Sequence, residues 1–336
     1  MNRILVLTRA LPWALTCCVV FLGFGLVSPA MAEQAPGQTR AISVNQFVEH
    51  PALDSVLRGF QEQLREEGFQ VEYRVHNAQA NMATANLIAR QIVGERPDLV
   101  LAIATPSAQA MAQTVKMNPS MQRTPILFSA VTDPLGAGLV KDLQHPGENI
   151  TGTSDLTPMD QHLALIREIH PELTSLGVIY NSGEANSRAL VNLLRAETDK
   201  AGITLEEATV ARSSDVFQSA RSLVGRAQAV YVPTDNTVVS AFEALAKVCQ
   251  DNKLPLYAAD VDSVPRGAVA ALGFDYFEHG RQAGAMAARI FRGAEPATTP
   301  VETQQDLKLH INLPAARAMG VTIPQAVLDR AVKIIE

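Results

Sequence analysis

Short apolar stretches alternate with amphipathic ones along most of the chain, from residue 41 to residue 312. Runs such as LVLAIA at 99–104 are apolar on both faces, which is typical of strands in a covered parallel sheet. The pattern predicts strands at 41–47, 71–75, 99–104, 126–130, 150–153, 175–180, 204–209, 229–233, 256–259, 269–273 and 307–312. It predicts helices at 51–67, 82–93, 107–116, 158–170, 186–201, 216–226, 237–251 and 276–291. Such alternation favours an α/β fold with doubly wound parallel sheets.

The same arrangement occurs twice along the chain. Thr105 and Asp133 follow two strands of the first half, and Thr234 and Asp262 follow two strands of the second, with the same spacing of 28 positions (105 to 133, and 234 to 262). We therefore expect two similar doubly wound parallel-sheet lobes joined by a hinge of several crossings. The expected bounds are 40–150 with about 275–300 for the first lobe, and 151–274 with about 301–336 for the second. The crossings are expected near 146–152, 273–276 and 300–306.

The first 32 residues have the pattern of a secretory signal peptide. Arg3 and Arg9 precede an uncharged apolar stretch at 11–27, and Ala30-Met31-Ala32 forms a small-x-small cleavage site. The alternative is a membrane anchor that is kept. Neither Cys17 nor Cys18 follows a convincing lipobox. The export signal predicts a periplasmic location.

Charge narrows the range of partners. The 336-residue chain has a formal net charge of −6, and residues 1–32 carry two Arg and no acid, so the exported form would carry −8. An acidic chain without a Lys/Arg cluster argues against nucleic-acid and anionic-membrane binding. Without the signal peptide the chain keeps one thiol, Cys249, which we interpret as core, and loses its sole tryptophan, Trp13.

Polar residues gather where the predicted strands end, at the edge where open α/β sheets bind ligands. The candidates in the first half are Thr105, Ser107, Thr132 and Asp133. The candidates in the second half are Asn181, Glu184, Asn186 and Asp235, and Asp260, Asp262 and Asp275 are further residues of the same kind. Each could instead cap the helix that follows its strand, and the two roles can coexist. His50, at another strand end, could begin a helix or line the cleft.

The composition of these strand ends indicates the charge of a ligand. A phosphate or dicarboxylate site would recruit Arg or Lys, and few occur here. Acids, hydroxyls and helix N-termini suit a zwitterion, because backbone amides can bind its carboxylate and an Asp or Glu its ammonium. Aromatic side chains near strand ends could stack on the ligand or belong to the core; they are Phe47, Phe128, Tyr180, Tyr231, Tyr257, Phe274 and Tyr276.

Motifs of the common enzyme classes are missing from the sequence. It has no G-x-S-x-G elbow, no Walker A motif and no complete dinucleotide-binding fingerprint. The seven His are scattered without zinc-ligand spacing. We therefore expect a binding protein that is not an enzyme and that needs no cofactor and no metal.

Six short motifs, in this order, resemble those of the ABC-transporter substrate-binding protein family that includes tryptophan- and tyrosine-type amino-acid binders. They are HPALD at 50–54, TPSAQA at 105–110, FSAVTDP at 128–134, NITG at 149–152, YNSGEANS at 180–187 and PTDN at 233–236. The resemblance covers residues 40–325 and implies a type I periplasmic-binding fold with the ligand between two α/β lobes. It also implies a membrane permease and an ATPase as partners.

The resemblance distributes the candidate residues over two cleft walls. Thr105, Ser107, Thr132 and Asp133 would line the first lobe's side, and Asn181, Glu184, Asn186 and Asp235 the second lobe's side. The combined hypothesis is a monomeric periplasmic component of an ABC importer that binds a zwitterion, an amino acid with an apolar or aromatic side chain. The alternative is a periplasmic ligand-sensing subunit for a membrane-bound signalling protein.

Overall fold

The computed structural model describes residues 39–336. The signal peptide predicted at 1–32 lies outside these residues. Among the helices described, none is both long enough and apolar enough to span a bilayer.

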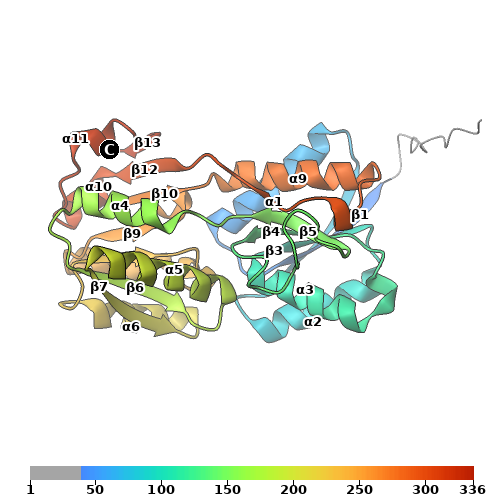
Figure 1. Cartoon of the computed structure of the whole chain (residues 1–336), viewed down its shortest axis with the longest axis horizontal. Coiled ribbons are helices and arrows are strands. Elements are labelled where there is room, and N and C mark those ends of the chain that lie inside the picture. Colours follow the sequence, from blue (N-terminus) through green and yellow to red (C-terminus); the bar gives the residue numbers. More distant parts are fainter. Residues whose placement is uncertain (1–38) are drawn as a thin grey trace, which may run out of the picture. The chain divides into compact units, whose positions relative to one another are not determined.

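The first lobe is built on a six-stranded sheet in the order β11-β5-β4-β3-β1-β2, and every pairing in it is parallel. Its strands are β1 (Arg40–Gln46), β2 (Val71–Asn77), β3 (Leu99–Ile103), β4 (Ile126–Val131), β5 (Ile150–Ser154) and β11 (Glu302–Thr303). Its helices are α1 (Pro51–Glu66), α2 (Met82–Glu95), α3 (Thr105–Met117) and α9 (Tyr276–Phe291). Figure 1 shows α1 and α9 on one side of this sheet and α2 and α3 on the other.

The second lobe is built on a seven-stranded sheet in the order β13-β12-β10-β9-β8-β6-β7. Its strands are β6 (Ser175–Asn181), β7 (Thr204–Val210), β8 (Ala229–Val232), β9 (Leu256–Ala258), β10 (Ala270–Gly273), β12 (Lys308–Asn312) and β13 (Lys333–Ile335). Its helices are α4 (Met159–Ile169), α5 (Ala185–Ala201), α6 (Val216–Leu223), α7 (Asn236–Ser240), α8 (Phe242–Asp251), α10 (Leu313–Ala318) and α11 (Gln325–Leu328). Within this sheet β10 and β12 pair antiparallel, and the other pairs are parallel.

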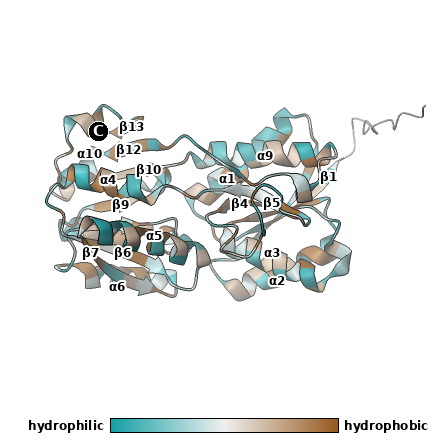
Figure 2. Cartoon of the chain, in the orientation of Figure 1, coloured by the Kyte–Doolittle hydropathy of each residue, from teal (hydrophilic) through white to brown (hydrophobic). Residues whose placement is uncertain are grey.

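Each lobe has its own hydrophobic core. All residues of β3 and of β8 are buried, as the two-sided apolar pattern of these strands predicts. Figure 2 shows the hydrophobic colour along the strands and a mixture of colours on the covering helices. The buried apolar residues form one cluster around the first sheet and another around the second. The predicted fold of two doubly wound lobes is confirmed.

The chain passes between the two sheets three times. It leaves the first sheet after β5, returns to the first lobe between β10 and α9, and passes again to the second sheet between β11 and β12. The first crossing comes a few residues after the expected 146–152, and the third, between 303 and 308, overlaps the expected 300–306. Strand β5 pairs with β4 through Ser154, and the two residues of β11 pair with β5, so both remain in the first sheet. A two-residue strand has too short a pattern to be recognised.

One predicted helix is divided. The stretch expected to be a single helix at 237–251 forms α7 and α8, which meet at Ala241 with φ −120°. The first part contains three consecutive β-branched residues from Thr237, and the Ser240 hydroxyl donates to the Thr237 carbonyl. Both features weaken helical hydrogen bonding. Strands β11 and β13 and helices α10 and α11 were not predicted.

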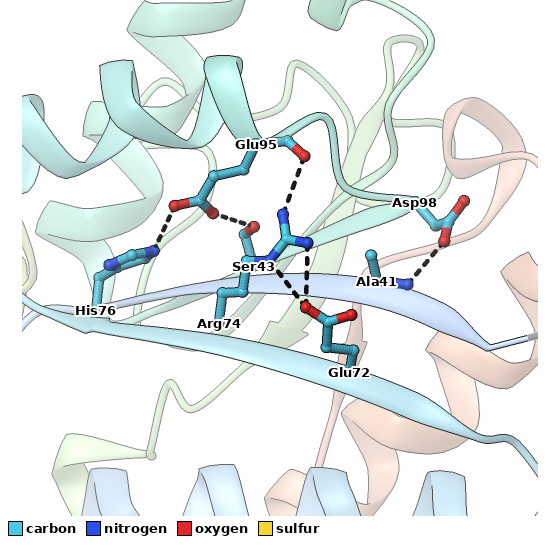
Figure 3. A network of polar contacts seen from close by, with 7 residues as sticks. All are labelled: Ala41, Ser43, Glu72, Arg74, His76, Glu95 and Asp98. Carbon is cyan, nitrogen blue, oxygen red and sulfur yellow. Dashed lines mark hydrogen bonds and ion pairs between the residues drawn. The ribbon is translucent and has the colours of Figure 1, made fainter.

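A polar network fastens the C-terminal end of α2 to the outer strands of the first sheet (Figure 3). The Glu95 carboxylate accepts a hydrogen bond from the Ser43 hydroxyl (2.5 Å) and lies 2.9 Å from His76 Nε2. Arg74 donates to the Glu95 carbonyl at 3.1 Å. A cation at this position also complements the negative end of the helix dipole. These contacts set the position of α2 on its sheet.

Helices α1 and α9 approach so closely that their contact requires glycine. A Cβ on Gly59 would lie 2.0 Å from the Phe277 carbonyl oxygen, and a Cβ on Gly280 would lie 2.1 Å from that of Val56. Backbone atoms cannot move aside as a flexible side chain can. The two helices therefore form one tightly packed pair over the first sheet.

We predict that Gly280→Ala lowers the free energy of unfolding by about 1–3 kcal/mol or more, because the methyl group forces the helices apart. Gly94→Ala is the matched control. Gly94 lies in α2 with no atom within 4 Å of the added Cβ, so alanine should raise stability by up to about 1 kcal/mol. Urea unfolding of both variants measures this, and equal effects at the two sites would contradict the close-packing argument.

Candidate functional site

A small cavity, of about 20 Å³, is lined by residues of both lobes. The lining residues of the first lobe are His50, Ala52, Leu53, Ala130, Thr132, Asp155 and Tyr276. Those of the second lobe are Asn186, Thr234, Asp235, Asn236, Val239 and Asp260. The two walls come within 3.5 Å of each other between the hydroxyl oxygens of Thr132 and Thr234.

The cavity lining is acidic. Three of the lining residues are Asp and, within the described part of the chain, none of the lining residues is Lys or Arg. All three Asp are buried. A buried carboxylate is costly unless hydrogen bonds or a cation satisfy it, so the partners of each one decide what it can still bind.

Asp155, the first residue after β5, accepts two hydrogen bonds from hydroxyls. Thr132 donates to Oδ1 at 2.9 Å, and Tyr276 donates to Oδ2 at 2.8 Å. Burial raises the pKa of Asp155 above its usual value, although the Tyr276 and Thr132 hydrogen bonds oppose that rise. Each carboxylate oxygen keeps capacity for a further donor.

Asp235 is more fully used within the protein than Asp155, whereas Asp260 accepts as many hydrogen bonds as Asp155 does. Asp235 caps α7 by accepting from Val238 N at 2.8 Å, and its Oδ2 accepts from Asn181 N (2.5 Å) and the Ser187 hydroxyl (2.6 Å). Burial and the nearby charge of Glu184 raise its pKa. Asp260 accepts from the backbone and the hydroxyl of Ser263 at 2.8 and 2.7 Å. The helix-cap role that the sequence left open is therefore present at Asp235.

Glu184 does not line the cavity but binds the start of α7. Its carboxylate accepts from the backbone N–H of Asn236 and of Thr237, and from the side chains of both residues, at 2.5–3.3 Å. Asn181 also lies outside the lining and donates to the Thr237 hydroxyl at 2.9 Å. Both residues hold the cavity wall in place from behind.

Asn186 lines the cavity with an unsatisfied acceptor. Its Nδ2 donates to the Thr234 carbonyl at 2.9 Å, while its buried Oδ1 has no hydrogen-bond partner among residues 39–336. Buried amide oxygens are rarely left unpaired, so this atom is suited to a donor on a ligand. Thr132, Asn186 and Asp235 are the principal sequence candidates that reach the cavity lining, and Asp260, His50 and Tyr276, also considered from the sequence, reach it as well.

The remaining first-lobe candidates lie elsewhere. Ser107 is buried and donates to Asn45 Oδ1 at 3.1 Å, and Thr105 is buried in the first turn of α3. Asp133 forms a turn by accepting from Gly136 N at 2.8 Å. Helix α3 begins at Thr105, so Ser107 is not its cap. None of the three lines the cavity.

His50 begins α1 and also lines the cavity, so both roles considered for it occur together. Its Nδ1 accepts from Leu53 N at 3.5 Å, at the helix N-cap. Burial, together with the charge of Arg266, lowers the pKa of His50 to about 3. The imidazole is therefore neutral at physiological pH, and it adds no positive charge to the cavity.

Two non-glycine residues at the ends of neighbouring strands have left-handed backbone. Ala104, after β3, has φ 78°, and Ala130, within β4, has φ 53°. Left-handed backbone is costly for alanine and tends to cluster at functional sites. Both residues lie at the carboxyl-end edge of the sheet, as Thr132 and Asp155 do, and Ala130 is one of the residues that line the cavity.

Sequence reasoning missed one of the three acids that line the cavity, Asp155. Its signal is the same as that of the chosen candidates, a polar residue directly after a buried strand, but β5 was expected to end at 153 and Ser154 extends it. Thr234 and Asn236 were also missed, since they flank a cap that had already been assigned. In the part of the chain that the structure describes, no group of three His, Cys, Asp or Glu is arranged to hold a metal ion.

Comparison with known proteins places this geometry among ligand-binding proteins. A family model described as ABC transporter substrate binding protein matches residues 41–335. A tyrosine-binding protein of Clostridioides difficile is 38% identical over 284 residues, which cover 83% of this chain and 81% of the relative.

Solved structures agree with this match. A conserved domain protein from Vibrio cholerae has a TM-score of 0.84 at 43% identity, covering 88% of this chain and 100% of its own. A Streptococcus pneumoniae domain in complex with L-Trp has a TM-score of 0.82 at 36% identity, with the same coverage. A ligand-free, open substrate-binding protein from Clostridium difficile, also 36% identical, has a TM-score of 0.65 and covers 88% of this chain and 99% of its own. At equal identity, the chain is closer in structure to the ligand complex than to the open form.

We predict that the stability of Asp155→Asn relative to the wild type rises with pH. The raised pKa of Asp155 in the fold means that its contribution to stability is lost as pH rises above the ordinary value of 3.8 and through the folded pKa. Asparagine does not ionise and avoids that loss. Thermal melts of both ligand-free proteins from about pH 4 to about pH 8 measure the difference, and a difference independent of pH would contradict this assignment.

Proposed function

This chain belongs to the ABC transporter substrate-binding protein family, whose members are solute-binding proteins and not enzymes, and from that membership we propose that it binds a free amino acid between its lobes. The ligand we propose is a zwitterion with an apolar or aromatic side chain. The protein would deliver it, in the periplasm, to the permease and ATPase of an importer in the inner membrane. Proteins of this family act outside the cytoplasm.

The observation that carries the proposal is the charge of the cavity. Three buried Asp and the unpaired Asn186 Oδ1 face a space without a basic side chain in its lining. Such a lining favours a ligand group that is cationic and a hydrogen-bond donor, which is the chemistry of an ammonium group. It disfavours phosphates, dicarboxylates and other anions.

Among the three acids we propose Asp155 as the principal partner of the ammonium. Asp235 already accepts three hydrogen bonds, and Asp260, which like Asp155 accepts two, also lies near the positive charge of Arg266. Asp155 is held by two hydroxyls alone. Thr132, Asn186 and Asp235 would complete the polar contacts, with Asn186 Oδ1 as a second acceptor from the opposite lobe.

The rest of the lining suits the remainder of an amino acid. Ala52, Leu53, Val239 and the ring of Tyr276 offer an apolar surface for a side chain. Ala52 lies in the first turn of α1, and its backbone N–H could bind a carboxylate, whereas Pro51 has no N–H and the Leu53 N–H donates to His50.

The comparisons support the same ligand class. One relative is named a tyrosine-binding protein and one similar domain was solved with L-Trp. We infer by analogy that an aromatic amino acid is the first ligand to test. The closer likeness to the L-Trp complex than to the open structure supports lobe closure as the binding step.

Binding can be tested on residues 33–336, which contain no tryptophan, so indole fluorescence reports the ligand alone. We expect L-Trp emission to change on titration with the protein, and L-Trp or L-Tyr to raise the melting temperature. A ligand at 100 times its dissociation constant adds about 2.7 kcal/mol of stability. Stabilisation by a sugar or nucleoside, with none by any amino acid, would refute the proposal.

We predict that Asp155→Asn weakens binding of the amino acid at least about tenfold, because the ammonium loses its buried charge partner. Asp133→Asn is the matched control, since asparagine can keep the turn to Gly136 and the residue lies outside the lining. Isothermal titration of both variants measures the affinities. Equal losses in the two, or unchanged affinity in Asp155→Asn, would remove Asp155 from the site.

A further inference from the structure

Strand β4 contains a bulge directly before its cavity-lining end. Its register with β5 shifts between Phe128 and Val131, since Phe128 pairs with Gly152 and Val131 with Ser154. Ala130 lies within this bulge with φ 53°. One more residue on β4 than on β5 leaves a backbone group without a ladder partner, and the group must find another.

His279 supplies that partner from a distant part of the sequence. The Ala130 N–H donates to His279 Nε2 at 3.2 Å. His279 lies in the first turns of α9, is fully buried, and has its Nε2 3.0 Å from the Thr153 hydroxyl on β5. It therefore contacts both strands at the point where their register shifts.

The hydrogen bond fixes the chemical state of the ring. Nε2 can accept from an N–H only when its proton is absent, so the neutral tautomer with the proton on Nδ1 is required. Burial lowers the pKa of His279 to about 4, which keeps the ring neutral at physiological pH. The ring is also held by Phe274, stacked at 6.5 Å between centroids, and by Tyr276, edge-on at 5.9 Å.

The bulge determines where the cavity wall lies. Ala130 itself lines the cavity, and two residues later Thr132 lines it and donates to Asp155. A regular strand would shift the residues after Ala130 by one position relative to β5 and turn their side chains to the other face of the sheet. Thr132 would then no longer meet Asp155.

We propose that His279 is a positioning residue for the ligand site, which holds the left-handed bulge at Ala130 and so places Thr132 and Asp155 against the ligand. This inference rests on the proposed function for its binding readout. His279 does not line the cavity and acts through the β4 backbone.

Four variants separate positioning from general packing. His279→Gln can place an acceptor near the position of Nε2, whereas His279→Leu fills the space without one. Ala130→Gly in the His279→Leu background lets the backbone adopt positive φ without strain, so it should restore the bulge without the histidine. His162→Leu is the control, a buried histidine of the second lobe that is bonded to the Tyr231 hydroxyl at 2.8 Å and lies outside the cavity lining.

We expect His279→Leu to weaken binding of L-Trp, or of whichever amino acid the wild type binds, by about tenfold or more. His279→Gln should stay within about threefold of the wild type, and the Ala130→Gly/His279→Leu protein should recover most of the loss. His162→Leu should lower the melting temperature without that loss of affinity. Wild-type affinity in His279→Leu, or no recovery in the double variant, would overturn the proposal.

Hydrogen exchange of the Ala130 amide gives a readout that needs no ligand. The amide should be protected in the wild type and in His279→Gln, and exchange faster in His279→Leu at pH values where the protein remains folded. Equal protection in His279→Leu would overturn the positioning role. If the wild type binds no amino acid but this pattern of protection is observed, the proposed function fails while the role of His279 in holding the bulge stands.

Discussion

Asp155 accepts hydrogen bonds from Thr132 and Tyr276, and these two bonds join three parts of the first lobe beside the cavity. Thr132 directly follows β4, Asp155 begins the first crossing between the lobes, and Tyr276 begins α9 just after the second crossing. The same carboxylate is the best candidate for the ligand's ammonium. On the proposed function, the ligand's charge and the joining of these three segments both depend on one buried group.

The arrangement also explains why the acid remains buried in the ligand-free chain. A lone carboxylate is expensive to desolvate, and two hydroxyl donors offset only part of that cost. The raised pKa of Asp155 reflects the part of the desolvation cost that the two hydroxyls do not offset. A ligand ammonium would offset the desolvation cost that remains at Asp155. The cavity therefore favours a cationic group.

The sequence allowed most of the strands and helices of both lobes to be predicted, because most buried strands are continuous apolar runs and the longer helices have an amphipathic period. The sequence could not show which of the polar side chains at the strand ends can still bind a ligand and which form hydrogen bonds within the protein. Glu184 and Asp235 follow strands in the same way. Glu184, however, uses its carboxylate for hydrogen bonds from the start of α7, whereas Asp235 caps α7 and also lines the cavity. That difference depends on donors about 50 positions away in the chain. His279 was undetectable for the same reason, since its partner Ala130 is 149 positions distant.

The close contact between α1 and α9 at Gly59 and Gly280 has a mechanical consequence. Helix α1 starts at the cavity with Ala52 and Leu53, and α9 starts at the second crossing with Tyr276. Two helices whose backbones touch cannot slide or bend independently. A ligand that contacts the first turn of α1, as proposed, would therefore shift α9 and the second crossing together with α1.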